Sequence, residues 1–380
     1  MKKVYVLQFS PCSSDNCGIG KYQENFMNIF ANYVEIETKF FDPGPYKTRL
    51  MKKDEFNVVK HKLAKELESF DILHIQHEFA LYSGSQFAQI INIAKSMDKK
   101  VVVTIHTSPS VILKSTQLSS FIINYLRQKW CHFRINKNHI YPIRKADLLI
   151  THNKNTSNDL NRYGIELNKI LQITIPVLKL RDFKHVSTEI TEKLKCSPED
   201  IIYAMVGFMN EHKNITDAVK ALKYLPEHYK FAIIGGMHPL DKGNIYNVIT
   251  DLIDKEGLKH RVYITGFVES DDQLNALIRE VDICVYPYSN RYYGQASSGA
   301  LNLAFANECP VIAYPTDSFK ELNEEFHPIK ITDKPACYEL AREIMLIDKD
   351  SLLNASAKFS EKYSYTNISR CILKAYQQLI

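Results

Sequence analysis

Short apolar runs alternate with helical patterns along most of the chain, and this alternation constrains the fold more than any other feature. Most of the runs are continuously apolar rather than alternating, which is typical of parallel strands covered on both faces. The intervening helical stretches include 21–31, 54–69 and 85–97. This pattern predicts a doubly wound α/β unit in the first half. Its predicted strands are 4–9, 34–41, 71–76, 101–106, 147–151 and 170–174.

The same alternation restarts after a stretch of low periodicity, 176–200, which we interpret as a linker. A chain of 380 residues is also too long for one ordinary core. We therefore predict a first Rossmann-like domain over 1–178, a second over 179–365, and a C-terminal helix over 366–380 that is long enough to cross back to the first domain. The strands predicted in the second domain are 201–207, 231–236, 262–266 and 282–287, followed by a short strand that starts at Pro310.

Composition excludes several classes of protein. The chain is 45% apolar and 24% charged, as in globular proteins rather than disordered ones. No uninterrupted apolar run reaches the ~18–20 residues of a membrane span, and the first residues are interpreted as a strand rather than a targeting signal. The eight cysteines form no CxxC pair, so we expect reduced thiols and a cytoplasmic protein.

Charge is distributed unevenly along the sequence. Residues 1–178 carry 24 Lys and Arg against 15 Asp and Glu, whereas the remainder carries 24 against 28. A basic first half indicates an acidic partner, which could be an anionic membrane surface, a phosphorylated acceptor or nucleic acid. Of these we expect contact with an anionic membrane, and not with nucleic acid. The alternative is an ordinary solvated basic face. Candidates for the membrane surface are the helix predicted over 118–130 and the cluster Arg127, Lys129, Arg134, Lys137, Arg144 and Lys145.

A loop of small residues within 291–315 is the first candidate binding element. Its sequence RYYGQASSGALNLAFANECPVIAYP predicts a loop, an apolar helix over 300–306 and a strand. Small residues that lead into a helix N-terminus leave backbone N–H groups aimed outward, where they bind phosphate or sugar hydroxyls. The alternative is a tight turn that uses small residues only for packing.

Polar groups follow several other predicted strands, at the edge where ligands bind in doubly wound sheets. His77 and Glu78 could bond an acceptor hydroxyl or act as acid and base, or form a loop ion pair instead. His106 is a second histidine at a strand end, where it could contact a ligand or be structural instead. Lys213 could place its ammonium on a diphosphate, unless it is an ordinary solvent-exposed lysine. The backbone after Gly266 could contact a nucleobase.

Other signals compete with this interpretation. The turn CGIG (17–20) has Gln23 at the third position of a dinucleotide fingerprint, which disfavours an NAD-dependent oxidoreductase. Tyr125 and Lys129 resemble an oxidoreductase pair but are better interpreted as neighbours one helical turn apart. Asp348 and Asp350 form a DxD sequence, which we interpret as a helix cap rather than a metal site.

Taken in order, CGIGKY, DILHIQHEF, VVVTIHTS, VGFMNEHKN and VYITGFVES resemble motifs of the GT-B glycosyltransferases, specifically the family 4 retaining enzymes, over nearly the whole chain. This resemblance implies two facing Rossmann-like domains, with the acceptor on the first and the donor on the second. It also implies a UDP- or GDP-linked sugar as donor, a glycan or lipid-linked acceptor, and no metal or other cofactor.

The resemblance implies roles for individual residues. His106 and Lys213 would be catalytic. From the residues' own chemistry we add Gln295 to the catalytic set and expect His77 and Glu78 to bind the acceptor. The residues implied for donor binding are Gly18, Gly207, Asn210, Gly266, Phe267, Val268, Ser297, Ser298, Gly299 and Ala300.

The chain also departs from the family pattern. Two glutamates of the family's donor motif are replaced by Gln295 and Leu303, and Phe208 or Asn210 stands where an arginine is usual. Two hypotheses therefore stay open. One is an active retaining transferase of bacterial surface polysaccharide synthesis, at the inner face of the membrane. The other is a catalytically silent GT-B subunit that binds a glycan or a partner transferase.

Overall fold

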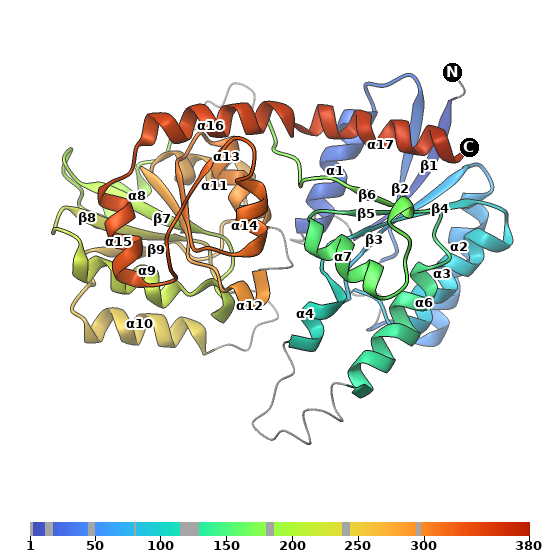
Figure 1. Ribbon diagram of the computed structural model, residues 1–380, viewed down its shortest axis with the longest axis horizontal. Coiled ribbons are helices and arrows are strands. Elements are labelled where there is room, and N and C mark those ends of the chain that lie inside the picture. The colour runs from blue at the N-terminus through green and yellow to red at the C-terminus, as the bar shows by residue number, and fades with distance from the viewer. Residues whose placement is uncertain are drawn as a thin grey trace. The chain divides into compact units, whose positions relative to one another are not determined.

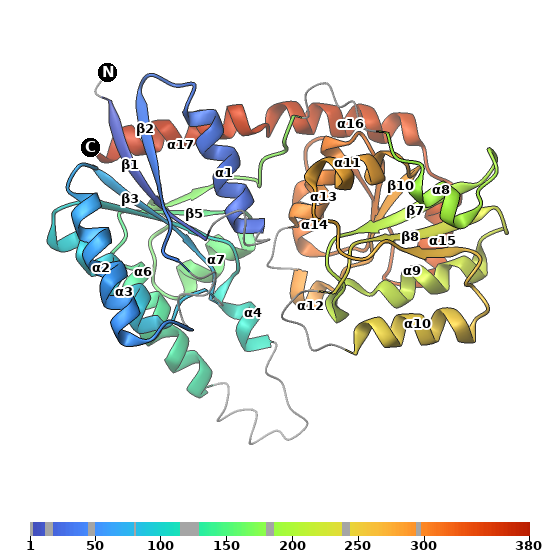
Figure 2. The same ribbon diagram turned by 180° about the vertical axis from the view of Figure 1, so that it is seen from behind.

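The computed structural model describes residues 3–11, 18–44, 50–79, 81–114, 129–179, 186–237, 244–293 and 298–380. Contacts within the chain divide it into two compact units (Figures 1 and 2). Unit 1 contains Met1–Ile175 and Tyr365–Ile380, and unit 2 contains Pro176–Gly294 and Ser298–Ser364. Each unit is built around its own parallel sheet.

Unit 1 has a six-stranded sheet in the order β2-β1-β3-β4-β5-β6, in which every pairing is parallel. The order reverses between β1 and β3, and in open α/β sheets this point is where ligands bind, beyond the carboxyl ends of the strands. The strands are β1 (Val4–Phe9), β2 (Ile36–Phe41), β3 (Ile72–His77), β4 (Lys100–Ile105), β5 (Leu148–Thr151) and β6 (Ile170–Gln172).

Helices cover both faces of this sheet (Figure 1). They include α1 (Gly18–Phe30), α2 (Lys53–Leu67), α3 (Gly84–Ser96), α4 (Pro109–Lys114), α6 (Tyr141–Ile143), α7 (Lys154–Arg162) and the C-terminal α17 (Tyr365–Leu379). Helix α17 packs on α1 within unit 1, where Tyr376 is fully buried. Every residue of β3 is buried, including the polar residues His74, Gln76 and His77, as expected for a central parallel strand covered on both faces.

Unit 2 has a six-stranded sheet in the order β12-β11-β10-β7-β8-β9, again with parallel pairings. The order reverses between β7 and β10, the dinucleotide-fold arrangement in which the first and fourth strands are adjacent. Its strands are β7 (Ile201–Val206), β8 (Tyr229–Ile234), β9 (Val262–Ile264), β10 (Ile283–Tyr286), β11 (Val311–Ala313) and β12 (Ile329–Ile331).

The helices of unit 2 complete the second doubly wound unit (Figure 2). They are α8 (Glu189–Leu194), α9 (Ile215–Ala221), α10 (Ile245–Lys255), α11 (Asp271–Arg279), α12 (Asn290–Tyr293), α13 (Gly299–Ala306), α14 (Asp317–Leu322), α15 (Cys337–Met345) and α16 (Lys349–Lys362). Two doubly wound parallel sheets confirm the predicted fold class.

Several local predictions are changed by the structure. The stretch 176–200 contains helix α8 and is not simply a linker, and β12 was not predicted. The side chain of Asp348 accepts a hydrogen bond from the Ser351 amide at 3.1 Å, which confirms the helix cap. Residues 115–128, and with them Tyr125, Arg127 and most of the helix predicted over 118–130, lie outside the described residues. Among the helices that are described, none is both long and apolar enough to cross a bilayer.

Candidate functional site

The turn after β7 in unit 2 is shaped by Gly207. Its φ of +101° is a backbone conformation that side chains disfavour. A Cβ at this position would lie 2.9 Å from Lys213 Nζ and 3.6 Å from the Cβ of Ala300. Glycine therefore leaves the space that the ammonium occupies, and it brings Lys213 and the start of α13 to the same place.

Lys213 lies at the end of the 3-10 turn η5 (Glu211–Lys213), and its side chain is buried. Its Nζ donates to the carbonyl of Val206 at 3.4 Å and lies 5.6 Å from the ring centroid of Tyr288. No ion pair to this ammonium occurs among the described residues. Burial lowers the pKa of Lys213 from 10.5 to about 7. The prediction of a functional rather than a solvent-exposed lysine thus gains support from its burial.

The lysine turn is tied to the chain that follows β10. The amide of Ser289 donates to the His212 carbonyl at 2.8 Å, and the side chain of Asn214 donates to the Pro287 carbonyl at 2.9 Å. Asn214 itself has a φ of +47°, a left-handed conformation that asparagine tolerates. These bonds hold Lys213 at the point where the strand order of unit 2 reverses.

Helix α13 begins at this same edge. The Ser298 side chain caps the helix by accepting from the Leu301 amide at 3.4 Å, and the Tyr286 hydroxyl donates to the Ala300 carbonyl at 2.7 Å. The first N–H groups of any helix, here those of Gly299 and Ala300, have no acceptor within the helix. Two further predicted site residues of this loop, Gln295 and Ser297, lie outside the described residues.

Two glycines after β8, Gly235 and Gly236, allow the turn that holds Lys213 and the chain after β9 to approach each other closely. A Cβ on Gly235 would lie 2.5 Å from the Gly207 carbonyl oxygen, and one on Gly236 would lie 2.6 Å from the Phe267 amide nitrogen. The Phe267 ring is 41% exposed and stacks on Phe208, with centroids 5.8 Å apart and planes 6° apart. Gly266, with a φ of +76°, and Val268, packed against the core, flank this ring.

Asn210 supplies a further polar group at this edge. Its side-chain oxygen Oδ1 is buried and has no hydrogen-bond partner among the described residues. A buried amide oxygen without a partner is costly unless a ligand or water satisfies it. The structure thus gathers the described residues of the predicted donor site in unit 2 at the carboxyl ends of β7 to β10.

In unit 1, His106 follows β4 and belongs to a chain of hydrogen bonds. Its Nε2 lies 2.8 Å from Gln76 Oε1, and the Gln76 amide in turn donates to Gln23 Oε1 at 2.5 Å. Because an amide oxygen only accepts, Nε2 carries the proton and Nδ1 keeps a lone pair. The pKa of His106 is held well below its usual value, mainly by burial and to a smaller extent by the neighbouring His152, His77 and His74. The ring is therefore neutral near pH 7.

The rings of Tyr22 and His152 pack against His106, with centroids 5.1 Å and 5.2 Å from it. His152 Nδ1 lies 3.3 Å from the Ile173 carbonyl, so this nitrogen donates and Nε2 is an acceptor. The Tyr22 hydroxyl, His152 Nε2 and Gln23 Nε2 are all buried, and none has a hydrogen-bond partner in the part of the chain that the structure describes. This cluster offers two donors and one acceptor to a polar ligand.

Sequence reasoning did not assign roles to Tyr22, Gln76 or His152. His152 directly follows β5, so the rule that drew attention to His106 could have found it as well. Tyr22 and Gln23 lie in the second turn of α1, where no local signal distinguishes a ligand contact from core packing.

The other predicted residues of unit 1 are placed differently. The ring of His77 is fully buried among Phe79, Tyr82, Phe87 and His139, because β3 extends one residue further than predicted. In this position the imidazole is enclosed by other side chains and is not exposed to an acceptor substrate. Glu78 is half-buried and accepts from the Thr107 hydroxyl at 2.5 Å. Gly18 is the exposed first residue of α1, and a Cβ there would meet no atom within 4 Å.

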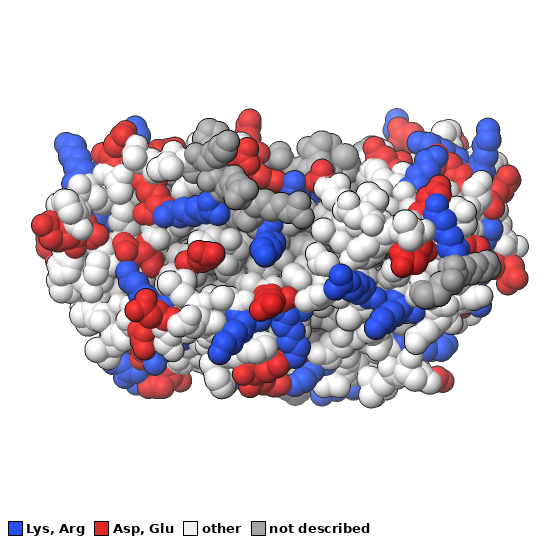
Figure 3. Space-filling view, turned by 90° about the horizontal axis from the view of Figure 1, so that it is seen from above, with Lys and Arg blue, Asp and Glu red and all other residues white. Residues whose placement is uncertain are grey.

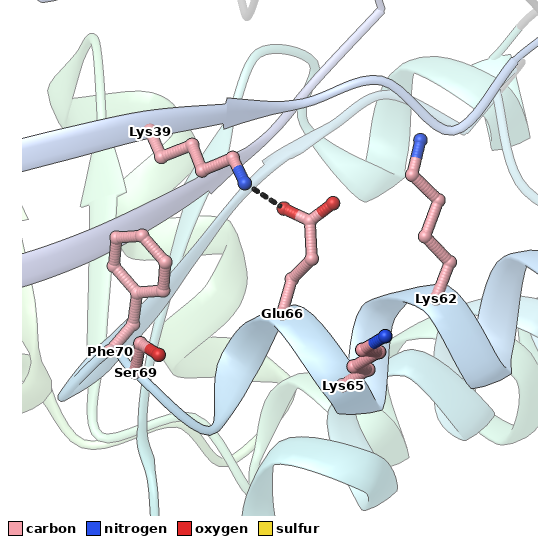
Figure 4. Close-up of a pocket in the computed structure, with 6 residues that line it drawn as sticks. All are labelled: Lys39, Lys62, Lys65, Glu66, Ser69 and Phe70. Atoms are coloured by element: carbon pink, nitrogen blue, oxygen red, sulfur yellow. Dashed lines mark ion pairs between the residues drawn. The ribbon is translucent and has the colours of Figure 1, made fainter.

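A separate pocket lies between β2 and α2 (Figure 4). Glu66 forms an ion pair with Lys39 at 2.9 Å across it, and Lys62 lies 5.3 Å from the Phe41 ring. Part of the positive charge is thereby neutralised, and none of the predicted site residues lines this pocket. Its lining residues are Lys39, Lys62, Lys65, Glu66, Ser69 and Phe70.

Comparisons with known proteins agree with the fold. Residues 186–364 match the family model described as "Glycosyl transferases group 1". A glycosyltransferase from Rickettsia africae ESF-5 is similar in structure, with a TM-score of 0.74 and 15% identity over 100% of this chain and 99% of that one. Comparison with curated protein sequences finds no match.

Two further solved structures share the architecture. Anabaena Alr3699/HepE in complex with UDP-glucose has a TM-score of 0.67 and 14% identity, covering 98% of this chain and 99% of that one. WaaG, described as a glycosyltransferase involved in lipopolysaccharide biosynthesis, has a TM-score of 0.62 and 12% identity, covering 98% and 99%. At such identities the likeness defines the fold.

The two doubly wound units and the similarity to these structures define a protein of the GT-B fold class. Within this class, residues 186–364 of unit 2 match the model of the glycosyl transferases group 1 family. The resemblance stated from the sequence motifs to GT-B glycosyltransferases is thus confirmed.

Proposed function

We propose that this chain is a retaining glycosyltransferase that moves a sugar from a UDP- or GDP-linked donor to a glycan or lipid-linked acceptor, without a metal. The family of unit 2 supports sugar transfer, and complexes of Anabaena Alr3699/HepE with UDP and with UDP-glucose support a nucleotide-sugar donor. The description of WaaG supports a role in bacterial surface polysaccharide synthesis. In this proposal the protein works in the cytoplasm, at the inner face of the membrane.

The observation that carries the proposal is the buried ammonium of Lys213. A buried cation without a carboxylate partner is costly, and a diphosphate placed beside it offsets this cost. The N-terminus of α13 adds unpaired N–H groups and the positive end of a helix dipole. Together these groups stabilise the negative charge that develops on the departing diphosphate, which is electrostatic catalysis.

The remaining donor contacts follow from the same edge of unit 2. The exposed ring of Phe267 offers an apolar face for a nucleobase, and the backbone of Gly266–Val268 offers polar groups to its edge. Asn210 Oδ1 accepts a hydrogen bond from the bound donor. Gln295 and Ser297 bind sugar hydroxyls in this proposal, and Gly18 contributes to diphosphate binding.

On unit 1, the lone pair of His106 Nδ1 accepts from a sugar hydroxyl. The hydroxyl of Tyr22 and Nε2 of His152 bind further hydroxyls beside it, because both atoms are buried without partners among the described residues. Glu78 binds the acceptor from the end of β3. We assign no direct acceptor contact to His77 because its ring is enclosed by aromatic side chains.

A second candidate is a catalytically silent subunit that binds a glycan or a partner transferase. The observation that favours it is Leu303, which packs against the hydrophobic core of unit 2 and cannot hold a ribose as a carboxylate would. Each charge-assisted hydrogen bond absent from the site removes about 1.5–3 kcal/mol.

Titration calorimetry with UDP and GDP tests the donor site directly. We expect one nucleotide to bind, and the isosteric Lys213→Met variant to lose most of this affinity. Lys220→Met, an exposed lysine on α9, is the matched control and should bind normally. A screen of nucleotide-sugars scored by nucleotide release then separates the candidates, since binding without turnover over a full acceptor panel favours the silent subunit. Wild-type turnover by Lys213→Met would contradict the role given to the lysine.

A further inference from the structure

The segment 129–145 of unit 1 exposes a row of aromatic side chains. Trp130, Phe133 and Tyr141 are 56%, 63% and 61% exposed. Residues 129–135, the π-helical turn η3 (Asn136–Ile140) and α6 form one continuous helical stretch. Positions 130, 133, 137 and 141 recur at the spacing of one helix face. The opposite face is buried through Ile135, Ile140 and Ile143.

Each of these aromatic rings carries a cation four residues further along. Arg134 lies 4.6 Å from the Trp130 ring centroid, Lys137 lies 6.0 Å from that of Phe133, and Lys145 lies 5.7 Å from that of Tyr141. We call these six residues the aromatic–basic stripe: Trp130, Phe133, Arg134, Lys137, Tyr141 and Lys145.

The stripe is positive and is not neutralised locally. Among the described residues, neither Arg134 nor Lys137 forms an ion pair, and Lys145 donates to the neutral side chain of Asn92 at 2.7 Å. The sequence contains no Asp or Glu between Asp98 and Asp147. Of the basic cluster proposed from sequence, Arg144 is held differently, because its guanidinium donates to the Tyr163 carbonyl at 2.5 Å.

The stripe is held firmly in place by the fold. Gly84, the first residue of α3, approaches so closely that a Cβ there would lie 2.1 Å from the Cβ of Asn138. This contact, together with the buried isoleucines, fixes the π-helical turn against unit 1. The surface is therefore preformed and needs no folding step upon binding.

Another face of the molecule carries mixed charge. Figure 3 shows a face on which Lys and Arg are interspersed with Asp and Glu. On α17, for example, the exposed cations Arg370 and Lys374 are accompanied by polar side chains and by no comparable row of exposed aromatic rings. A combination of exposed aromatic rings with uncompensated cations thus distinguishes the stripe from α17.

We infer that the aromatic–basic stripe docks unit 1 onto a lipid bilayer that contains anionic headgroups. Trp and Tyr prefer the boundary between headgroups and hydrocarbon, and Lys and Arg are attracted by anionic lipids. A helix that presents both kinds of side chain on one face lies in the plane of that boundary. The inference assigns residues to a membrane contact, and it does not depend on the donor site of unit 2.

The single tryptophan of the chain provides a direct probe because Trp130 lies in the stripe. With vesicles of phosphatidylcholine containing about one third phosphatidylglycerol, we expect the Trp130 emission to shift to the blue and the protein to co-sediment. Vesicles of phosphatidylcholine alone should bind far less, and added salt should weaken binding to the anionic vesicles.

Substitutions test the residues of the stripe. Arg134→Gln, Lys137→Gln and Lys145→Gln should each weaken co-sedimentation about fivefold. Phe133→Ser should weaken it further without removing charge. Arg370→Gln with Lys374→Gln on α17 is the charge-matched control and should leave vesicle binding unchanged. Circular dichroism and UDP affinity should be the same for all of these variants, which separates lost docking from lost folding or a failed donor site.

Equal binding to neutral and anionic vesicles would overturn the inference, as would full binding by the triple Arg134→Gln, Lys137→Gln, Lys145→Gln variant. Absence of any Trp130 shift with anionic vesicles would overturn it as well. A shift produced by single-stranded RNA but not by vesicles would reassign the stripe to nucleic acid.

Discussion

Unit 1 and unit 2 place polar groups at the carboxyl edge of a six-stranded parallel sheet by different means. In unit 1 the edge holds neutral side chains, with His106, Gln76 and Gln23 joined in a line of hydrogen bonds. In unit 2 it holds close-approaching glycines, a capped helix start and the buried ammonium of Lys213.

The difference teaches how each edge suits a different ligand. Neutral imidazoles and amides match sugar hydroxyls, which donate and accept without net charge. Backbone N–H groups with one ammonium match a diphosphate, whose charge is concentrated on a few oxygens. The two edges should therefore respond differently to pH and to substitution, and four experiments test this contrast.

Acidification should cause the largest loss of unfolding free energy, and it should act through the buried histidines of unit 1. Burial lowers the pKa of His74 to about 3 and that of His152 to about 4, against an ordinary value of 6.5. The unfolded chain therefore binds protons at these rings at a pH at which the folded chain does not. The free energy of unfolding is consequently highest above pH 6.5 and falls as the pH falls. At about pH 5 the loss should be about 2 kcal/mol for each of these rings. Denaturant unfolding followed by Trp130 fluorescence measures it.

Two variants sharpen this prediction. His152→Gln keeps a donor for the Ile173 carbonyl. It should reduce the loss of unfolding free energy on acidification by the amount expected for one ring. His61→Gln, at an exposed position on α2, should leave it unchanged. An identical pH dependence in His152→Gln and the wild type would contradict the prediction.

In unit 2 we expect the largest effect of a substitution from Gly207→Ala. Its φ of +101° and the 2.9 Å approach to Lys213 Nζ together should cost about 3 kcal/mol of unfolding free energy. Gly257→Ala is the matched control, since its φ is +69° but no atom lies within 4 Å of the new Cβ, and it should cost about 1 kcal/mol. Guanidinium unfolding followed by circular dichroism compares the two variants. Equal losses of unfolding free energy would show that the contact with Lys213 Nζ adds nothing to the cost of Gly207→Ala.

A smaller effect is expected from Tyr376→Phe in unit 1. The Tyr376 hydroxyl lies 2.6 Å from Nδ1 of His74, whose Nε2 in turn lies 2.7 Å from the Thr104 hydroxyl. Removing the hydroxyl leaves a buried acceptor unsatisfied and should cost about 2 kcal/mol. Tyr33→Phe, which removes an exposed bond to the Thr366 carbonyl of the same helix, should cost less than about 0.5 kcal/mol by the same unfolding measurement. Similar costs would mean that the hydroxyl of Tyr376 is not needed by the network.

The smallest effect concerns the pH dependence of nucleotide binding at unit 2. With a pKa of about 7, the Lys213 ammonium is charged below that pH and loses its proton above it. A diphosphate binds the charged form, so affinity for UDP should fall about fivefold between about pH 7 and pH 8. Calorimetry in buffers of different ionisation enthalpy should show proton uptake upon binding at the higher pH. In Lys213→Met this pH dependence should disappear, and its persistence there would assign it to another group.

The sequence by itself determined much of the fold. Apart from β12, the strands of both sheets lie within a few residues of the predicted ranges, because continuous apolar runs between helical patterns are typical of buried parallel strands. Strand β12 was missed because it has three residues, one of which is Lys330. Helix α8 was missed because six residues carry little periodicity.

The location of the proposed donor site was also predictable, since Gly207 ends a predicted strand, Lys213 follows it and Ala300 begins a predicted helix. Only the tertiary structure decided that Lys213 is buried without a carboxylate partner among the described residues, because desolvation depends on neighbours such as Tyr288 that are distant in sequence. The same holds for the cluster of Tyr22, His106 and His152, whose members come from α1 and from the ends of β4 and β5. Local sequence sets which residues form a strand or a helix, whereas the charge state and partners of a side chain depend on which elements pack around it.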